Sequence, residues 1–202
     1  MKLCIADPPY LGRAELFYGE RDLPQMQFHG SLNQMRKADR HPDAHEWDSP
    51  NRHSELVKRL TSEYDGWAIA MVPDNLRQYL QWVPNRTRIA VWHDPRVMPS
   101  GQHPRRRWEP VLIYVPDGRR RVNDVLTPVG DVLTCPHPGG SFAGSKPRQW
   151  TRWVLDMLGY NAETDTVDDL FHGSGAVAAE IAQGVLLCPT RGRSGCRTPR
   201  RR

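Results

Sequence analysis

The chain has few cysteines, and their spacing excludes two classes of small protein. The four cysteines are Cys4, Cys135, Cys188 and Cys196. No two of them form a Cys-x-x-Cys pair, so we expect reduced thiols rather than a disulfide framework or a zinc site. His41 and His45 are four residues apart, but no second ligand pair stands at zinc spacing, and we expect no metal there.

The chain also lacks any long apolar run. Only a short one follows Lys2, and no stretch is long enough to cross a membrane, so we expect no signal peptide and no membrane anchor. We therefore expect a cytoplasmic protein. Hydrophobic residues make up 38% of the 202 positions, so sizeable stretches must be loop or exposed, and the length suits one α/β core.

Acidic residues are missing from the end of the chain, where arginines gather. The last twelve residues contain six arginines and no acid, and we expect residues 189–202 to form a disordered basic tail. Two arginine triplets, Arg105 to Arg107 and Arg119 to Arg121, stand out against a net charge of only +5. Arginine clusters suit phosphate contacts and favour a polyanionic partner, with solvated loops as the alternative.

Alternating apolar segments predict an α/β fold. The apolar runs predict strands at 2–6, 67–72, 88–92 and 110–115, and helical spacing predicts helices at 54–64 and 74–82. Strand–helix–strand alternation implies a parallel sheet with right-handed crossovers. The strands at 88–92 and 110–115 have no helix between them, so we expect an antiparallel hairpin there. We expect Ser54 and Asp74 to cap the two helices.

Two long segments carry no sustained periodicity. Residues 11–52 are polar, and a segment of this length inside a compact domain is usually a functional lid or disordered. We expect a long loop that orders over bound substrate. Residues 116–145 are rich in Pro and Gly and too short for a core of their own, so we expect a single domain over residues 1–188 with a short insertion.

The tetrapeptide Asp7-Pro8-Pro9-Tyr10 follows the first apolar run and suits the task of holding a planar amino group. Asp7 can accept a hydrogen bond from an exocyclic amine, and the Pro8 carbonyl can accept the second hydrogen of that amine. The prolines restrict φ and keep both acceptors aimed, while Tyr10 offers a ring on which a base can stack. A proline-containing turn at a strand end is the alternative.

A second motif predicts a ligand-binding loop. Residues 166–175 indicate a short strand that runs into Gly173-Ser174-Gly175, and a helix is expected from Ala176 onward. Glycines at a strand-to-helix turn allow positive φ and close approach of a ligand to the backbone. Upstream, Ser145-Lys146-Pro147 precedes apolar residues at helical spacing from Trp150 to Leu158.

The order of these motifs resembles that of the DNA amino-methyltransferases that use S-adenosylmethionine. Asp-Pro-Pro-Tyr first, then Lys-Pro before an apolar helix, then Asp-x-Phe-x-Gly-Ser-Gly is similar to their circularly permuted β group. The resemblance covers roughly residues 1–12, 53–115 and 145–183. It implies a Rossmann-like α/β sheet, mostly parallel, with one reversed strand near the edge.

The resemblance also implies roles for single residues. The flipped base would be held by Asp7, Pro8, Pro9 and Tyr10. The pocket for S-adenosylmethionine would be lined by Lys146, Pro147, Asp169, Phe171, Gly173, Ser174 and Gly175. DNA would be the partner, with structured RNA as an alternative.

The expected sheet also separates the two arginine triplets. The loop 93–109 would open on the active-site side and bring Arg105, Arg106 and Arg107 to the nucleic acid. Arg119 to Arg121 follow the reversed strand, so we expect them to start at the opposite end of the sheet.

The expected target within this resemblance is the N6 amine of adenine. Asp at the first position of the tetrapeptide is more usual there for adenine N6, and Ser for cytosine N4. Methylation at cytosine carbon 5 requires a cysteine nucleophile. In the family of enzymes that carry it out this cysteine follows a proline, whereas Cys135 precedes Pro136. A nucleotide-binding dehydrogenase is disfavoured, because Gly173-Ser174-Gly175 lacks the later glycine of the dinucleotide fingerprint.

The chain departs from this family after residue 183. A complete cofactor domain would supply a further strand that ends in an acid for the ribose hydroxyls, and Gly184 to Cys188 could be that strand. No Asp or Glu follows Glu180, so we expect the strands of the second cofactor half to be trimmed. The alternative to an active enzyme is a truncated or degenerate member that binds nucleic acid without catalysis. A phage or mobile-element origin fits so compact a form.

Overall fold

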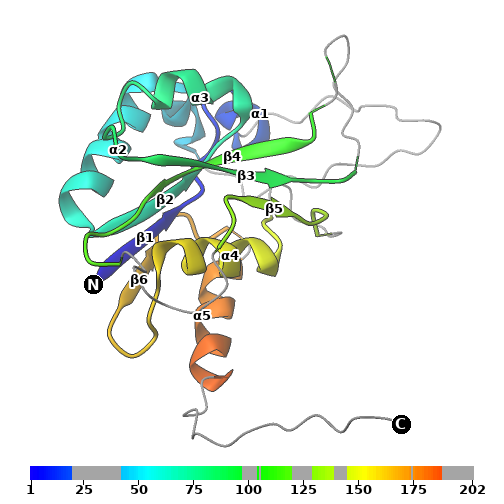
Figure 1. Ribbon diagram of the computed structural model, residues 1–202. Helices are drawn as coiled ribbons and strands as arrows, with labels where there is room; N and C mark the ends of the chain where they lie inside the picture. Colours follow the sequence, from blue (N-terminus) through cyan, green and yellow to red (C-terminus); the bar gives the residue numbers. More distant parts are fainter. Residues whose placement is uncertain are drawn as a thin grey trace, which may run out of the picture.

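The computed structural model describes residues 1–19, 42–96, 104, 106–119, 129–138, 145–173 and 175–187, with backbone alone for 183–187. Its strands are β1 (Lys2–Ala6), β2 (Gly66–Ala70), β3 (Arg88–His93), β4 (Trp108–Tyr114), β5 (Val132–Thr134) and β6 (Thr166–Asp169). Its helices are α1 (Ala14–Tyr18), the 3₁₀ helix η1 (Ala44–Asp48), α2 (Pro50–Glu63), α3 (Pro73–Tyr79), α4 (Arg148–Leu158) and α5 (Ala176–Leu187). Helices α2 and α3 lie on one side of the sheet, and α4 and α5 lie on the other (Figure 1).

The strands form one mixed sheet in the order β5-β3-β4-β2-β1-β6. Strand β1 pairs in parallel with β2 and with β6, and β3 pairs in parallel with β5. Strand β4 runs antiparallel to both β2 and β3 and stands third from the β5 edge. The mostly parallel Rossmann-like sheet with one reversed strand and the β3–β4 hairpin are thereby confirmed.

Strand β1 is apolar from Leu3 to Ala6 because both of its faces are buried. Leu3 and Ile5 belong to the core on the α4 side. Cys4 and Ala6 belong to the core on the α2 side, together with Leu60. Side chains alternate between the faces of a strand, so this one short strand supplies both layers and its carboxyl end is held rigidly.

Two helix caps differ from the sequence prediction. Helix α2 begins at Pro50 rather than at Ser54, and α3 begins at Pro73, so neither Ser54 nor Asp74 is a cap. Proline suits the first turn, where the missing N–H would have no partner in the helix. The expected caps were wrong because a proline can start a helix without a side-chain cap.

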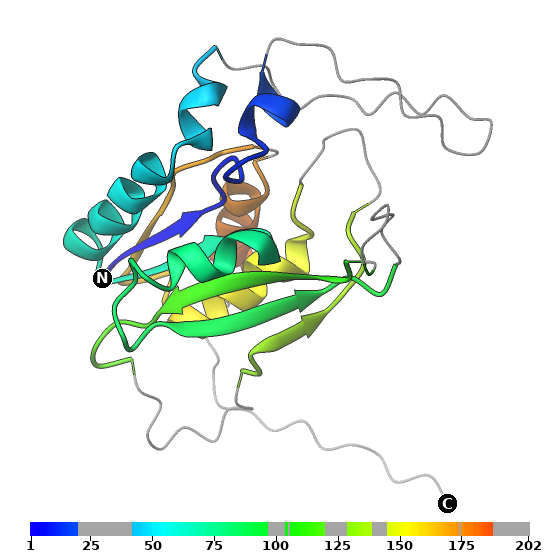
Figure 2. The same ribbon diagram turned by 90° about the horizontal axis from the view of Figure 1, so that it is seen from above.

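The segment 11–52 contains regular structure where it is described. Helices α1 and η1 lie side by side (Figure 2). The carboxylate of Asp48 joins them, since it accepts hydrogen bonds from Ala14 N at 2.9 Å and Glu15 N at 3.0 Å. The expectation of a loop throughout 11–52 is therefore wrong for this part, while 20–41 lie outside the described residues.

Other predicted segments are described only in part. Strand β5 lies within the predicted insertion 116–145, of which 120–128 and 139–144 are not described. The predicted tail 189–202 also lies outside the described residues. Its disorder and the single-domain boundary at 188 remain predictions.

Helix α5 extends farther than predicted. Residues 184–188 were a candidate for a further strand, but residues 184–187 continue α5, and Cys188 lies outside the described part. The reason is local: an alanine-rich helix runs into apolar residues without a proline, and Gly184 alone costs only about 1 kcal/mol. Strand β6 is therefore an edge of the sheet within the described residues.

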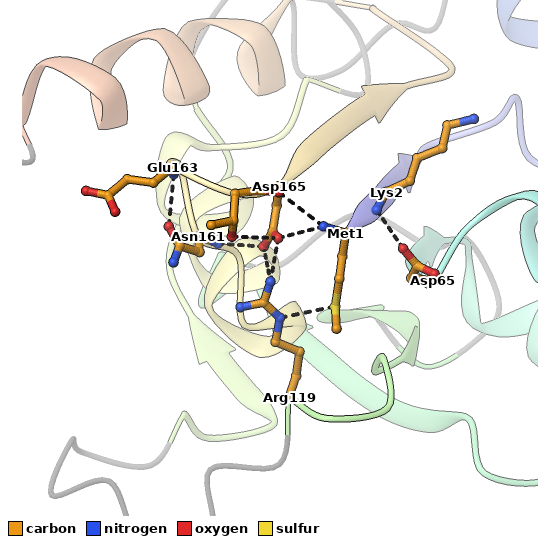
Figure 3. A network of polar contacts seen from close by, with 8 residues as sticks. Met1, Lys2, Asp65, Arg119, Asn161, Glu163 and Asp165 are labelled. Atoms are coloured by element: carbon orange, nitrogen blue, oxygen red, sulfur yellow. Dashed lines mark hydrogen bonds and ion pairs between the residues drawn. The ribbon is translucent and has the colours of Figure 1, made fainter.

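A buried carboxylate ties the first residue to the start of β6 (Figure 3). The Asp165 side chain has no exposed surface, and it accepts hydrogen bonds from the Met1 amino group at 2.9 Å and from Asn161 N at 2.8 Å. Arg119 donates to both carboxylate oxygens. Arg119 therefore lies at the end of the sheet opposite Asp7, as we predicted for this arginine triplet. Residues 120 and 121 lie outside the described part.

We expect Asp165→Asn to lower the free energy of unfolding by about 3 kcal/mol near neutral pH, because two cations lose their buried partner. Burial would raise the pKa of Asp165, but bonds from the Met1 amino group, the backbone and Arg119 hold it below its ordinary value. The ionised carboxylate therefore stabilises the fold at pH values above the ordinary carboxyl pKa. This stabilisation is lost as the pH falls through the pKa that Asp165 has in the folded protein, which is the lower of the two.

Urea unfolding at about pH 7 and about pH 3 measures this effect. The difference between the parent protein and Asp165→Asn should shrink at the acidic pH. The control is Asp117→Asn, since the Asp117 side chain is 82% exposed. A difference of the same size at both pH values would contradict the assignment.

Candidate active site

A pocket of about 510 Å³ opens where β1 and β6 end. The two strands are parallel neighbours, with Ile5 opposite Asp169, so the segments that follow them leave the sheet side by side. Asp7 lines the pocket from the segment after β1, Phe171 from the segment after β6, and Lys146 from the segment before α4. Motifs from both ends of the chain therefore share one pocket.

Most predicted site residues lie on this pocket or beside it. Those that line it are Asp7, Pro9, Lys146, Asp169, Phe171 and Gly173. Pro8 and Pro147 are buried next to their lining neighbours, and Pro147 is the N-terminal cap of α4. Tyr10 reaches the site through its hydroxyl, 2.7 Å from Lys146 Nζ. Ser174 lies outside the described residues.

An ion pair stands at the centre of the site. Lys146 Nζ lies 3.0 and 2.9 Å from the two Asp7 oxygens and 3.5 Å from Glu109 Oε2. The Lys146 side chain is 7% exposed and the Asp7 side chain 25% exposed, so the ammonium is held beneath a carboxylate that solvent reaches. Tyr10 completes the group by donating its hydroxyl hydrogen to Glu109 at 3.0 Å.

Aromatic rings surround the same ammonium. Lys146 Nζ lies 5.3 Å from the centroid of the Tyr10 ring, 5.8 Å from that of Trp150 and 5.9 Å from that of Trp92. The faces of such rings attract a cation within about 6 Å. The Lys146 ammonium therefore lies among two carboxylates and three aromatic rings, an environment that favours positive charge.

The pKa values follow from this arrangement. Loss of hydration raises the pKa of Asp7, and the Lys146 ammonium opposes that rise. Burial alone would lower the pKa of Lys146, but Asp7 and Glu109 outweigh it and raise the pKa above the ordinary value. Lys146 is therefore charged at neutral pH.

The glycine loop forms the far end of the pocket. Gly173 has φ 44° and Gly175 has φ 73°, conformations that L side chains rarely adopt. The Asp169 carboxylate accepts a hydrogen bond from Phe171 N at 3.2 Å, which holds the turn. Burial raises the pKa of Asp169, although this backbone bond works against the rise.

The sequence reading missed the wall that faces this loop. Trp47 of η1 packs edge-on against Phe171, with ring centroids 4.9 Å apart. His53 holds Trp47 in place. Its Nε2 lies 2.6 Å from the Trp47 carbonyl oxygen, and its Nδ1 lies 2.5 Å from the Tyr79 hydroxyl. Burial lowers the pKa of His53, so the neutral ring donates to the carbonyl and accepts from the tyrosine. Trp47 gave no signal because its segment has no periodicity.

Glu109 was also missed. We predicted the reversed strand from 110, but β4 begins at Trp108, so Glu109 is held in the sheet rather than in the preceding loop. Its register partner on β3 is Trp92, one of the three rings around Lys146. A polar residue just before an apolar run was the only signal that the sequence offered.

Two of the three predicted nucleic-acid residues are described. Arg106 lies 2.7 Å and Arg13 lies 3.3 Å from the same Asp74 oxygen. Arg13 belongs to the turn after the tetrapeptide, because its N–H donates to the Tyr10 carbonyl at 2.9 Å. Arg107 donates to the Pro95 carbonyl at 2.9 Å. Because two cations share the single Asp74 carboxylate, a local positive charge remains. The third predicted residue, Arg105, lies outside the described residues.

The described part of the chain contains neither a metal cluster nor a membrane-spanning helix. Within it, no group of three or more His, Cys, Asp or Glu side chains is placed to hold a metal ion. Within the same residues, no helix has the length and apolar character that crossing a bilayer requires.

No protein-family model and no curated protein matches this chain. Among solved structures it is similar to the one described as the crystal structure of the M1.HpyAVI–SAM complex, with a TM-score of 0.47 and 15% sequence identity. That similarity covers 90% of this chain and 78% of the other. So distant a likeness carries no argument about activity, and the fold stands on the strand order and pairing described above.

Proposed function

We propose that this protein transfers a methyl group from S-adenosylmethionine to the exocyclic amine of a flipped nucleic-acid base, with adenine N6 in DNA as the target. One observation carries the proposal. The tetrapeptide, Lys146 and the glycine loop, which lie far apart in the sequence, line a single pocket of about 510 Å³. Each supplies chemistry that amine methylation needs.

The residues present fit the cofactor. Asp169 offers a carboxylate for an amino-acid ammonium, Phe171 offers an apolar surface, and the positive-φ glycines let a ligand approach the backbone. Trp150 and Thr151 also line the pocket, so its wall beside Lys146 comes from the first turn of α4.

The other end of the pocket fits the amine. The amine of adenine is a poor nucleophile because its lone pair is delocalised into the ring. Acceptors at Asp7 and the Pro8 carbonyl would favour a pyramidal nitrogen with its lone pair directed toward the methyl group. When bound, S-adenosylmethionine would supply an electrophilic methyl group on a sulfonium. The amine nitrogen would bond to the methyl carbon, the sulfur would keep the electrons of the broken bond, and the amine would release one proton to water.

A base inside a duplex cannot reach this pocket, so the proposal includes base flipping or a single-stranded substrate. Arg106 and Arg107 support a nucleic-acid partner, together with Trp108, which is 39% exposed. Arg13 adds a further cation beside the tetrapeptide. Within the resemblance, the Asp at position 7 favours adenine over cytosine.

One observation favours a second candidate function, a nucleic-acid-binding remnant without catalysis. Within the described residues, strand β6 is an edge of the sheet, and no further strand lies beside it to carry an acid for ribose hydroxyls. Calorimetry with S-adenosylmethionine separates the two candidates. Binding supports the enzyme, and a chain that binds DNA but no cofactor supports the remnant.

We expect Asp7→Asn to reduce methyl transfer roughly 100-fold, because the amide no longer offers two negative acceptors to position the amine. Binding of S-adenosylmethionine should change little, since Asp7 stands at the amine end of the pocket. The measurement is transfer of tritiated methyl to unmethylated plasmid DNA, with calorimetry for the cofactor. Asp117→Asn is the matched control and should keep parent activity. Equal turnover by Asp7→Asn and the parent protein would show that Asp7 is only a turn residue.

For the nucleic-acid surface, we expect the double variant Arg106→Gln/Arg107→Gln to bind DNA more weakly and with a smaller dependence on salt. Each phosphate contact removed should lower the slope of log affinity against log salt by about 1. Arg59→Gln is the control, because Arg59 lies on α2 and pairs with Glu63 within that helix. An unchanged slope in the double variant would exclude these arginines from the phosphate contacts.

A further inference from the structure

Lys146 occupies the place that the proposed function gives to the amine of the base. Its three hydrogens face three acceptors, the two Asp7 oxygens at 3.0 and 2.9 Å and the Tyr10 hydroxyl at 2.7 Å. An amine that donates to Asp7 must therefore compete with Lys146 for the same carboxylate.

That competition favours Lys146. Its side chain is 7% exposed and lies among three aromatic rings, so it is both charged and enclosed. The contact of Lys146 with Asp7 joins two opposite charges, whereas the neutral amine of a base would bring no charge of its own to the same carboxylate. A buried ammonium that lost its carboxylate would be costly. The amine can therefore gain Asp7 only if Lys146 keeps another anionic partner.

Glu109 stands where such a partner is needed. Its Oε2 is 3.5 Å from Lys146 Nζ, already within ion-pair distance. Within the described residues the Glu109 carboxylate contacts Tyr10 and Lys146. The Tyr10 hydroxyl contacts both Lys146 and Glu109, so the ammonium can keep one acceptor while it exchanges one carboxylate for the other.

We propose that Glu109 is a positioning residue that receives Lys146 when the amine of the base binds Asp7. The proposal rests on the proposed function, because it requires an amine in the pocket. Both carboxylates have a use in it: Asp7 holds the amine, and Glu109 holds the ammonium that the amine displaces. The same exchange returns Lys146 to Asp7 when the product leaves, so Asp7 is never left without a donor.

The test is a double-mutant cycle between Glu109→Gln and Lys146→Met. Glutamine keeps the size of Glu109 and an acceptor for Tyr10 but removes the charge that Lys146 would move to. Glu109→Gln should therefore raise KM for plasmid DNA about tenfold or more with a smaller change in kcat, since the competent state becomes rarer. In the Lys146→Met background no ammonium competes, so adding Glu109→Gln should change KM less than about twofold.

A second readout needs no cofactor. Fluorescence anisotropy measures binding of a single-stranded oligo(dA) and of an abasic oligonucleotide of equal length. Glu109→Gln should weaken the preference for oligo(dA) only when Lys146 is present. Lys146→Gln is a second background should methionine prevent folding, and Glu63→Gln, an exposed pair partner on α2, is the matched control.

The outcomes separate the two proposals. An unchanged KM in Glu109→Gln, or an equal effect of that change in both Lys146 backgrounds, overturns the role of Glu109 while methyl transfer by the parent protein still stands. A folded parent protein that neither binds S-adenosylmethionine nor transfers methyl groups overturns the proposed function, and the role of Glu109 falls with it.

Discussion

The ion pair between Lys146 and Asp7 joins the two ends of the chain at one point. Asp7 leaves the buried strand β1, and Lys146 precedes α4, which packs on the same sheet. Their contact at 2.9 Å brings the tetrapeptide against the segment that leads to the glycine loop. The charges would be costly to bury alone, so each requires the other, and the pocket takes its shape and its electrostatic character from their pairing.

The strand order of the sheet brings the two ends of the chain together at this pocket. Strands β1 and β6 are parallel neighbours although they lie at opposite ends of the sequence, so their carboxyl ends open at one edge. Ligands bind at this edge in open α/β sheets. The reversed strand β4 adds Glu109 from the other side of β2, which no βαβ unit would have placed there. The sheet thereby gathers three polar side chains, Asp7, Tyr10 and Glu109, around the ammonium of Lys146.

The sequence predicted the strands and most of the candidate site residues, but not every residue of the site. Continuous apolar runs made β1 and β2 recognisable as strands buried on both faces. The order of the motifs assigned Asp7 to the base and Lys146 and Gly173 to the cofactor, and in the structure all three line one pocket. Sequence patterns did not indicate the residues whose role depends on the tertiary fold alone. Glu109 depends on where β4 begins, and Trp47 depends on a 3₁₀ turn in a segment without periodicity. The run after Gly184 was misread because a short apolar segment suits a strand or the end of a helix equally well.

The most direct test of the pocket as an amine-methylating site is the identity of the methylated nucleoside. Unmethylated DNA would be incubated with the protein and with S-adenosylmethionine that carries a deuterated methyl group, then digested and analysed by mass spectrometry. The proposed function predicts the label in N6-methyladenine. Label in 5-methylcytosine, or no label in any base from a folded protein that binds the cofactor, would contradict it.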